Sequence, residues 1–311
     1  MSAVLEEQPT EMPQFMSVRQ VAQYLHLNEK KIYALLKEGN IPGTKITGKW
    51  LFPRELIDRW ILDASHGGVL NDRLVVSGSD DPLLYRMTLA FAQQSRSHAL
   101  VTYSPTGTRL GLELLQANRA DLCALHWGPD VESGTRHPAL LTQYPQHRNW
   151  VLVRLFRRRQ GVLLNPRLNL ADATLDELVR ISHRQGLRWN MRQPGSGTQR
   201  FFIDALSGGE RDLQYLDQHS QALSERDAAA KVAMGIADCT PGTEATAVEF
   251  GLDFLAIGWE GFDLALSRHI YFRNLFQELL KLLKSEAGLE TSLQLRGYDL
   301  NACGRIVWSA E

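Results

Sequence analysis

Apolar residues recur at helical spacing in two short segments near the start of the chain. Residues 17–27 and residues 29–39 each place their aliphatic side chains on one face. Ser17 and Asn28 precede these segments as typical helix N-caps, and Gly39 is a typical left-handed stop. Two short helices separated by a turn of about three residues indicate a helix-turn-helix, whose second helix normally enters the major groove of DNA.

The pattern changes to strand-like alternation after the second helix. Residues 44–52 alternate around Gly48 as a β-hairpin would. Residues 54–64 then return to helical spacing, after Pro53. We therefore expect the hairpin to form a wing and the last segment to form a third helix.

The distribution of charge along the chain is uneven. The whole chain has a net charge of -1, so its total charge does not indicate nucleic acid. Between Ser17 and Arg54, however, seven Lys and Arg residues stand against two Glu residues, which gives a local charge of +5. Attraction to DNA phosphates requires such a local footprint. The basic residues are Arg19, Lys30, Lys31, Lys37, Lys45, Lys49 and Arg54. A protein-interaction module with a solvated basic face is the alternative interpretation.

Residues 17–61 carry a Val-Ala-x-x-Leu helix, an Ile-Tyr-x-Leu-x-x-x-Gly-x-Ile-Pro run and a Gly-Lys-Trp-x-Phe wing. Over its whole length this stretch resembles the excisionase-like, MerR-related helix-turn-helix family. The resemblance implies binding to a double-stranded DNA operator, with Lys30, Lys31 and Tyr33 on the recognition helix and Lys49 in the wing. Contacts of these lysines with phosphate would position the protein without specifying a sequence.

From Arg73 onward, strand-like runs alternate with helical runs, as in LVVSG before DPLLYRMTLAFAQQ and ALVTYS before TRLGLELLQANRA. This alternation is typical of an open α/β sheet, in which a ligand crevice lies at the carboxyl ends of the strands. The expected domain order is a disordered leader at 1–15, a winged helix-turn-helix domain at 16–64, a polar, glycine-bearing linker at 65–72 and a ligand-binding domain at 73–311.

The loops that follow the expected strands are rich in Gly, Ser and Thr. A glycine-rich turn at a helix N-terminus exposes unpaired backbone N–H groups, Ser and Thr add hydroxyl groups, and the helix dipole favours negative charge. These loops therefore predict a site for a small anion or a polar metabolite. The candidate ligand-binding residues are Ser77, Ser79, Asp80, Thr106, Gly107, Thr108, His126, Trp127, Arg192, Gly195, Ser196, Gly197, Thr198 and Asp238.

Four segments, VVSGSDDPLL, SPTGTRLGLELLQANRADLCALHW, RQPGSGTQRFFIDAL and AAAKVAMGIADCTPGTEATA, together resemble the type-two periplasmic-binding-protein fold. They are similar to its cytoplasmic branch, which is related to molybdate-binding proteins. The resemblance implies an α/β fold with lobe one at about 73–155 and 256–311 and lobe two at about 160–252. It places crossover strands near 151–163 and 252–260, and it places the ligand in the cleft between the lobes.

The same resemblance favours molybdate or tungstate as the ligand. The contacts that it implies are Ser77, Ser79, Thr106, Thr108, Ser196 and Thr198. The site of a dedicated molybdate carrier consists of hydroxyl and amide groups, and His126, Trp127 and Arg192 are bulkier than these. A larger or organic ligand is therefore the alternative. Each of these residues also has an alternative structural role. His126 would be a histidine with its hydrogen bonds satisfied at a strand edge, Trp127 would serve packing, and Arg192 would be a surface arginine or part of an interlobe salt bridge. We expect the run Arg157–Arg159 to be solvated turn charge.

These observations favour a ligand-responsive transcriptional regulator, in which a ligand closes the lobes and changes the geometry or oligomeric state of the DNA-binding heads. We expect a homodimer or a higher homo-oligomer, because DNA half-sites pair. No cofactor or metal site is expected, because Cys123, Cys239 and Cys303 lie far apart without zinc-type spacing. The sequence has no secretory signal and no run of roughly 18 apolar residues, which favours the cytoplasm and no membrane partner.

An enzyme or a carrier for a small metabolite, linked to molybdenum-cofactor metabolism, is the alternative function. Catalysis is not expected, because Gly195-Ser196-Gly197 lacks the Gly-x-Ser-x-Gly elbow and no Ser/His/Asp arrangement occurs in motif form. A carrier without a regulatory role would leave the N-terminal module without a purpose.

Overall fold

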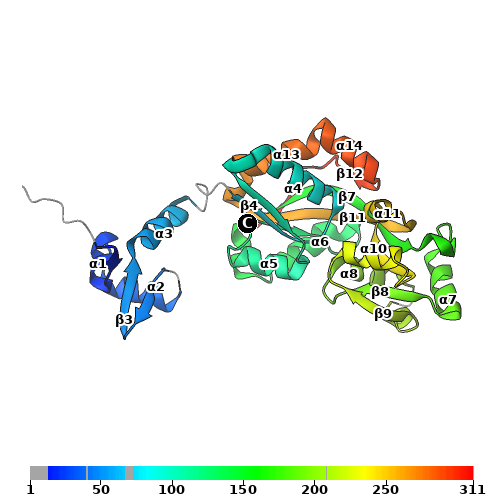
Figure 1. The fold of residues 1–311 in the computed structure, drawn as a ribbon, viewed down its shortest axis with the longest axis horizontal. Coiled ribbons are helices and arrows are strands. Elements are labelled where there is room, and N and C mark those ends of the chain that lie inside the picture. The colour runs from blue at the N-terminus through cyan, green and yellow to red at the C-terminus, as the bar shows by residue number, and fades with distance from the viewer. Residues whose placement is uncertain (1–12, 40, 67–72, 208, 311) are drawn as a thin grey trace, which may run out of the picture. The chain divides into compact units, whose positions relative to one another are not determined.

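The chain forms two compact units in a computed structural model (Figure 1). The residues that the structure describes are 13–39, 41–66, 73–207 and 209–310. The first unit ends at Asn71 and the second begins at Asp72. Of the expected leader and linker, residues 1–12 and 67–72 lie outside the described residues. The other two expected linker residues belong to a helix of the first unit.

The first unit combines three helices with a three-stranded antiparallel sheet. Its elements are β1 (Phe15–Met16), α1 (Val18–Tyr24), α2 (Glu29–Lys37), β2 (Thr44–Ile46), β3 (Lys49–Pro53) and α3 (Arg54–His66). The expected caps are confirmed, since Ser17 accepts a hydrogen bond from the Gln20 N–H and Asn28 accepts one from the Lys31 N–H. Phe15, which we expected in a disordered leader, instead pairs with β3 in this sheet.

The wing is a tight hairpin that rests on a small apolar core. Thr47 and Gly48 connect β2 to β3 with φ angles of 48° and 83°. Positive φ at both positions is what a two-residue type I′ turn requires. The buried residues of the core are Met16, Val18, Val21, Ala22, Ile32, Ile41, Phe52 and Ile57. The first unit therefore has a core of its own, contributed by its helices and its sheet.

The second unit is built on a ten-stranded sheet within the described residues. The strands are β4 (Arg73–Gly78), β5 (Leu100–Ser104), β6 (Leu122–Leu125), β7 (Trp150–Leu164), β8 (Arg188–Arg192), β9 (Asp217–Ala222), β10 (Cys239–Thr243), β11 (Asp253–Ser267), β12 (Tyr298–Asp299) and β13 (Ile306–Ser309). Their order is β5-β4-β6-β11-β7-β10-β8-β9, and β12 and β13 pair with β7. This mixture of parallel and antiparallel neighbours, with helices packed on it, confirms the expected α/β class.

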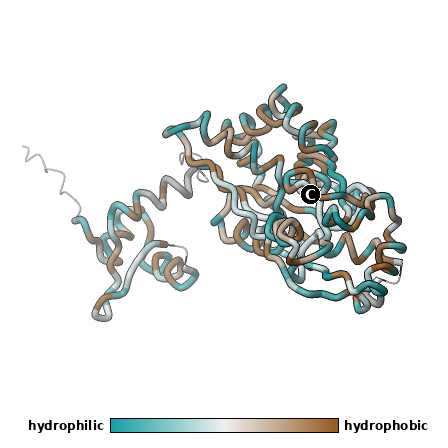
Figure 2. Tube along the Cα trace, turned by 45° about the vertical axis from the view of Figure 1, so that its right-hand side comes forward, coloured by the Kyte–Doolittle hydropathy of each residue, from teal (hydrophilic) through white to brown (hydrophobic). Residues whose placement is uncertain are grey.

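Helices connect most of these strands. They are α4 (Pro82–Ser95), α5 (Thr108–Gln116), α6 (Asp130–Leu141), α7 (Leu175–Gln185), α8 (Gly197–Ala205), α9 (Glu210–Leu213), α10 (Glu225–Ala233), α11 (Glu244–Phe250), α12 (Arg268–Tyr271), α13 (Asn274–Lys284) and α14 (Glu286–Leu295). Hydrophobic and hydrophilic positions alternate along many of them (Figure 2). Within the described part of the chain, none of the helices is both long and apolar enough to cross a membrane.

Two long strands, β7 and β11, join the two lobes of the second unit. They pair antiparallel along almost their whole length. Lobe one is the part around β4, β5 and β6, which reaches β11 through β6; lobe two is the part around β8, β9 and β10, which reaches β7 through β10. A Cβ atom on Gly161 of β7 would lie 2.1 Å from the Leu255 carbonyl oxygen of β11. Glycine therefore permits the close approach of the two crossing strands.

Each lobe has its own apolar core. Phe156 and Phe262 stack in lobe one with ring centroids 4.9 Å apart, and Trp189 packs on Phe202 in lobe two at 5.2 Å. The single strand β7 contributes residues to both cores. Because the cores are separate, the lobes can move as bodies about β7 and β11.

Candidate functional site

Five segments at strand ends and helix starts meet between the two lobes. They are the residues after β4, the start of α5, the residue after β6, the stretch from the end of β8 to the start of α8, and the start of α10. Together they enclose a small space, called the inner cavity here. Its lining residues are Ser79, Asp80, Gly107, Thr108, His126, Arg192, Ser196, Gly197, Thr198 and Glu225. Nine of the fourteen residues that the sequence analysis named as ligand-binding are thus brought together.

The two lobes are closed on the inner cavity. Its free volume is about 10 Å³, which is room for about one water molecule. Gly197 of lobe two lies directly against His126 of lobe one, since a Cβ atom on this glycine would be 2.3 Å from the His126 carbonyl oxygen. Nearby, Arg136 of lobe one and Asp204 of lobe two form an ion pair at 2.6 Å. A ligand larger than water therefore enters only when the lobes separate.

The inner cavity contains a buried cation and a buried carboxylate, each with one unpartnered atom. Arg192 is 6% exposed, and its Nη2 donates to the Leu223 carbonyl oxygen at 3.2 Å, whereas its Nε has no hydrogen-bond partner among the described residues. One oxygen of Asp80 lies 3.4 Å from the Arg226 guanidinium, and the other is buried without a partner in the same described set. Burial lowers the pKa of Arg192 and raises the pKa of Asp80. A donor and an acceptor are thus available to a ligand.

Hydroxyl groups and two helix N-termini complete the inner cavity. The hydroxyl oxygens of Ser79 and Thr108 lie 2.8 Å apart. Gly107 and Ser196 occupy the N-cap positions of α5 and α8, and neither helix is capped by a side-chain hydrogen bond. Backbone N–H groups at uncapped helix starts attract anions. The arrangement can therefore hold a small anion through hydrogen bonds from both lobes.

Glu225 is the one lining residue that the sequence analysis missed. It is 1% exposed, and its Oε1 accepts hydrogen bonds from the Thr243 N–H at 2.8 Å and the Thr246 hydroxyl at 2.7 Å. Burial alone would raise the pKa of Glu225, but the charges of Arg158 and Arg192 outweigh it and lower that pKa. In the sequence this residue looks like an ordinary acidic residue in the first turn of a helix, so no local signal marks it.

Our expectation that Arg157–Arg159 form a solvated turn is wrong. All three residues lie within β7, and Arg158 is 1% exposed. Its guanidinium lies 2.9 Å from an oxygen of Asp81 and 2.7 Å from an oxygen of Glu260. The run stands where β7 passes between the lobes, so the middle arginine is buried and must be paired with carboxylates.

His126 joins the inner cavity to this buried charge cluster. Its Nδ1 lies 2.7 Å from Glu260, and its ring stacks on Phe262. Burial lowers the pKa of His126. Burial would raise the pKa of Glu260, but the charges of His126 and Arg158 and their hydrogen bonds outweigh it, so that this pKa is about 2. Glu260 therefore stays ionised, and its contacts connect His126 of the cavity wall to Arg158 of β7.

Five of the named residues lie outside the inner cavity. The Ser77 hydroxyl donates to the Leu122 carbonyl oxygen at 3.2 Å and so joins neighbouring strands. Thr106, Trp127 and Gly195 line adjoining hollows instead. Asp238 forms ion pairs with Arg167 and Arg188 at the amino end of β10. Because β8 and β10 are parallel, that end is the one away from Arg192, and the structure does not bring Asp238 to the cavity.

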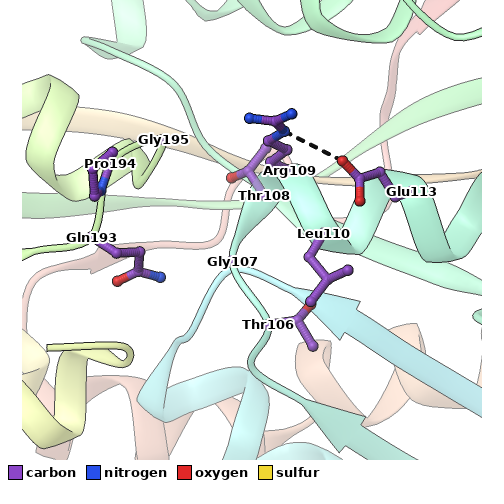
Figure 3. A pocket seen from close by; sticks show the side chains of 9 residues that line it. All are labelled: Thr106, Gly107, Thr108, Arg109, Leu110, Glu113, Gln193, Pro194 and Gly195. Atoms are coloured by element: carbon purple, nitrogen blue, oxygen red, sulfur yellow. Dashed lines mark hydrogen bonds and ion pairs between the residues drawn. The ribbon is translucent and has the colours of Figure 1, made fainter.

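Two larger hollows adjoin the inner cavity. The first outer hollow has a volume of about 340 Å³ and is shown in Figure 3. It is lined by Thr106, Gly107, Thr108, Arg109, Leu110, Glu113, Gln193, Pro194 and Gly195. The second outer hollow has a volume of about 450 Å³. It is lined by Thr108, Arg109, Leu112, Glu113, Trp127, Leu140, Gln143, Tyr144 and Gly195. Figure 3 shows the loop of lobe two at Gln193, Pro194 and Gly195 opposite the start of α5, so the first outer hollow lies between the two lobes.

The side chains named as DNA-binding all lie on the surface of the first unit. Those on helices are Arg19 of α1, Lys30, Lys31, Tyr33 and Lys37 of α2, and Arg54 of α3, and those in the wing are Lys45 and Lys49. Tyr33 is 51% exposed, whereas its neighbour Ile32 is fully buried. Helix α2 therefore presents a polar face with two lysines in its first turn. This placement fits a recognition helix with an adjacent wing.

Two family models match the chain. The one described as PBP superfamily domain matches residues 89–284, and a helix-turn-helix domain matches residues 15–65. No curated protein matches. Within the described residues, no group of three or more His, Cys, Asp or Glu side chains is arranged to hold a metal ion.

Solved structures with a similar fold come from two kinds of protein. A Clostridium perfringens substrate-binding protein assigned to phosphate ABC transport, with bound phosphate, is 10% identical at a TM-score of 0.53, over 74% of this chain and 100% of that chain. A cysteine-to-serine mutant of Corynebacterium glutamicum OxyR with bound hydrogen peroxide is 14% identical at a TM-score of 0.54, over 90% of both chains. At such identities the likeness is one of fold.

Proposed function

Because the chain belongs to the PBP superfamily domain family and carries a helix-turn-helix domain ahead of that domain, we propose that it is a DNA-binding regulator controlled by a small ligand in the interlobe cleft. The observation that carries the proposal is the inner cavity, to which both lobes contribute hydrogen-bonding groups around Arg192 and Asp80. The first unit binds the operator and the second binds the effector. Since the partner is DNA, we place the protein in the cytoplasm.

The effector in this proposal is a small oxyanion that also carries a hydrogen-bond donor. Arg192 supplies positive charge, and the N–H groups at the starts of α5 and α8 supply further donors. Asp80 and Glu225 place carboxylates in the same cavity, which would repel a ligand without a proton to share. A protonated oxyanion such as hydrogenphosphate, or a phosphonate, meets both requirements.

Molybdate and tungstate, which the sequence resemblance favours, are the alternative effectors. At neutral pH these dianions carry no hydrogen to donate to Asp80. Their binding therefore requires that Asp80 itself is protonated, and the burial that raises its pKa acts in that direction. A panel that contains both kinds of oxyanion decides between the two ligand classes.

Lobe closure supplies the two states that regulation requires. A ligand shifts DNA binding only if its affinity differs between the DNA-competent and incompetent states, and the coupling is reciprocal. The contact between Gly197 and His126 belongs to the closed state. Pairing of two chains on two half-sites makes a homodimer the expected DNA-bound form. Closure of the cleft then changes the spacing or the pairing of the two DNA-binding units.

A thermal-shift panel tests the ligand. The full chain is heated with phosphate, methylphosphonate, sulfate, molybdate or tungstate, because a ligand that binds only the folded state raises Tm. We expect a protonated oxyanion to raise Tm in the natural chain but not in Arg192→Gln. Arg184→Gln, at an exposed arginine of the same lobe, should keep the shift. If no anion in the panel raises Tm, oxyanion sensing is wrong.

A gel-shift series on the DNA upstream of the protein's own gene tests the switch. We expect the ligand to change the dissociation constant for DNA by at least about fivefold. A carrier without a regulatory role would bind no operator, and an enzyme would consume the anion during the experiment. If DNA affinity is the same with and without a ligand known to bind, the ligand does not control DNA binding. The protein would then be a DNA-binding protein without ligand control.

A further inference from the structure

The second outer hollow has walls suited to an organic group. Leu112 and Leu140 supply aliphatic surface, and Trp127 and Tyr144 supply aromatic rings. We infer that this hollow holds an uncharged, ring-bearing substituent of the effector, whose anionic group sits in the inner cavity. The effector is then an organic oxyanion, such as an aryl phosphonate or an aryl phosphate ester. This inference rests on the proposed function, because it requires that the inner cavity binds an oxyanion.

The volumes of the three spaces support this division of the ligand. The inner cavity has about 10 Å³ of free space, whereas the second outer hollow has about 450 Å³. Sites for organic ligands commonly measure roughly 300–1,000 Å³ and combine apolar walls with a few polar groups. An inorganic oxyanion, admitted when the lobes separate, would use only the inner cavity and would leave the larger space unused. A ligand with a substituent uses both.

The charged residues at the rim of the hollow neutralise one another. Arg109 and Glu113, one turn apart on α5, form an ion pair at 3.3 Å, which Figure 3 shows as a dashed line. Both side chains line the hollow and are 83% and 50% exposed, so the ion pair lies at its solvent side and its opposite charges compensate each other. The remaining polar lining residues, Thr108 and Gln143, are uncharged. The space therefore favours a substituent without a charge of its own.

A hydrogen bond fixes the backbone of Trp127 at one wall. The backbone N–H of Trp127 donates to Nε2 of His137 at 3.0 Å, and Nδ1 of His137 lies 2.6 Å from Asp263. Because Nε2 accepts, the hydrogen of the neutral ring is on Nδ1 and is donated to the carboxylate. Tyr144, on the same hollow, packs against Trp150 with ring centroids 5.8 Å apart. The Trp127 backbone and the Tyr144 ring are thus held before a ligand arrives, which lowers the entropic cost of binding.

The hollow and the inner cavity lie side by side and share a lining residue. Thr108 lines all three spaces, and Gly195 lines both outer hollows. A Cβ atom on Gly195 would meet nothing within 4 Å, and one on Gly107 would meet only the Gln193 amide nitrogen, at 3.5 Å. Neither glycine carries a side chain that would narrow the space between the inner cavity and the outer hollows. A substituent attached to an anion beside Thr108 therefore leads outward into the hollow.

Isothermal titration of the full chain with phosphate, methylphosphonate and phenylphosphonate tests the inference. The two phosphonates are compared at a pH where they carry the same charge, so that only the substituent differs. We expect phenylphosphonate to bind at least about tenfold more tightly than methylphosphonate, because burial of the ring carbons adds apolar contact. Gln143→Trp fills the hollow and should abolish this tenfold gain. It should change phosphate affinity less than about twofold.

Gln294→Trp is the matched control, because it adds the same side chain at an exposed position on α14, outside the hollow. It should keep the full tenfold gain. If the anions bind but the phenyl and methyl compounds have equal affinity, the subsite is wrong and the proposed oxyanion sensor stands. If the phenyl gain survives Gln143→Trp, the substituent lies elsewhere and the inference is overturned. If no anion binds the natural chain, the proposed ligand class fails and the subsite fails with it.

Discussion

The two units use charged side chains in contrasting ways. In the first unit the basic residues named for DNA, such as Lys30, Lys31 and Lys49, are exposed. In the second unit Arg158 and Arg192 are buried, and Arg158 is held between two carboxylates. Exposed charges attract a polyanion over a distance and are screened by salt, whereas buried charges act at contact and are screened little. A surface that binds by long-range attraction is thus joined to a cavity that binds by short-range fit.

The two units also differ in how their functional residues are assembled. The exposed basic residues come from one continuous stretch, from Arg19 to Arg54. The inner cavity takes residues from segments between Ser79 and Glu225, in both lobes. A substitution on the surface of the first unit should therefore act locally. A substitution in the second unit can act through the relative position of two lobes or through a buried charge.

Arg158→Met should have the largest effect, because it leaves Asp81 and Glu260 buried without their shared cation. We expect the free energy of unfolding of the second unit to fall by about 3–5 kcal/mol. Urea denaturation followed by circular dichroism measures the loss. Arg157→Met, at a neighbour whose side chain is 39% exposed, should cost no more than about 1 kcal/mol. Equal losses in the two variants would remove the distinction between buried and exposed charge.

Gly197→Ala should block closure of the lobes. The added methyl group would lie 2.3 Å from the His126 carbonyl oxygen, so the closed state must distort or open. Overpacking of this kind costs about 1–3 kcal/mol, which corresponds to roughly a five- to 150-fold loss of ligand affinity. Titration calorimetry measures the affinity, and small-angle scattering reports whether the second unit expands.

The matched control for this variant is Gly134→Ala on α6, where an added Cβ would meet nothing within 4 Å. It should leave ligand affinity unchanged, and it should favour the helix slightly. Full ligand affinity in Gly197→Ala would show that the contact with His126 is not needed for binding. The closed state would then not be the ligand-bound state.

The fold of the first unit follows from local signals. Ser17 and Asn28 cap their helices as expected, and Gly48 forms the turn of the wing, because each acts on residues within three positions of itself. Nine cavity residues were also predictable, since glycines and hydroxyls at the ends of parallel strands meet at one edge of the sheet. Asp238 was misplaced because it stands before β10 and not after it.

The remaining features of the site depend on distant contacts. Glu225 is set by its hydrogen bonds to Thr243 and Thr246, which follow it by 18 and 21 positions. Arg158 is buried because β7 continues from one lobe into the other, whereas the run of three arginines suggests a solvated turn. Periodicity reports the environment of a few neighbouring residues, so it cannot show that two lobes close over a charge.

Lys31→Ala tests whether the exposed charges of the first unit contact DNA phosphates. Lys31 is exposed in the first turn of α2, and loss of one phosphate contact should lower the slope of log K against log salt concentration by about 1. Fluorescence anisotropy with labelled DNA at several salt concentrations measures this slope. Ligand affinity should not change. Lys284→Ala, at an exposed lysine of the second unit, should leave the slope as it is. An unchanged slope for Lys31→Ala would place α2 away from the DNA backbone.

The smallest expected effect concerns the buried carboxylate of Asp80 in the ligand-free protein. Burial, only partly offset by the charge of Arg226, raises the pKa of Asp80 above that of an unfolded chain. The contribution of this group to stability is therefore fully present below the unfolded pKa of about 3.9 and is lost as pH rises through the folded pKa. Asp80→Asn removes the titration, so the Tm of the variant relative to the natural chain should increase as pH rises from about 4 to 7.

Thermal unfolding of the two proteins across this pH range measures the difference. Asp172→Asn, at an exposed carboxylate of lobe two, should track the natural chain at every pH. A constant or falling difference for Asp80→Asn would mean that its carboxylate is stabilised where it lies, with its second oxygen satisfied. Asp80 would then not be an acceptor for a ligand's hydrogen, and the preference for a protonated oxyanion would rest on Glu225 alone. The contrast with the exposed charges of the first unit would then be carried by Arg192 and Glu225, without Asp80.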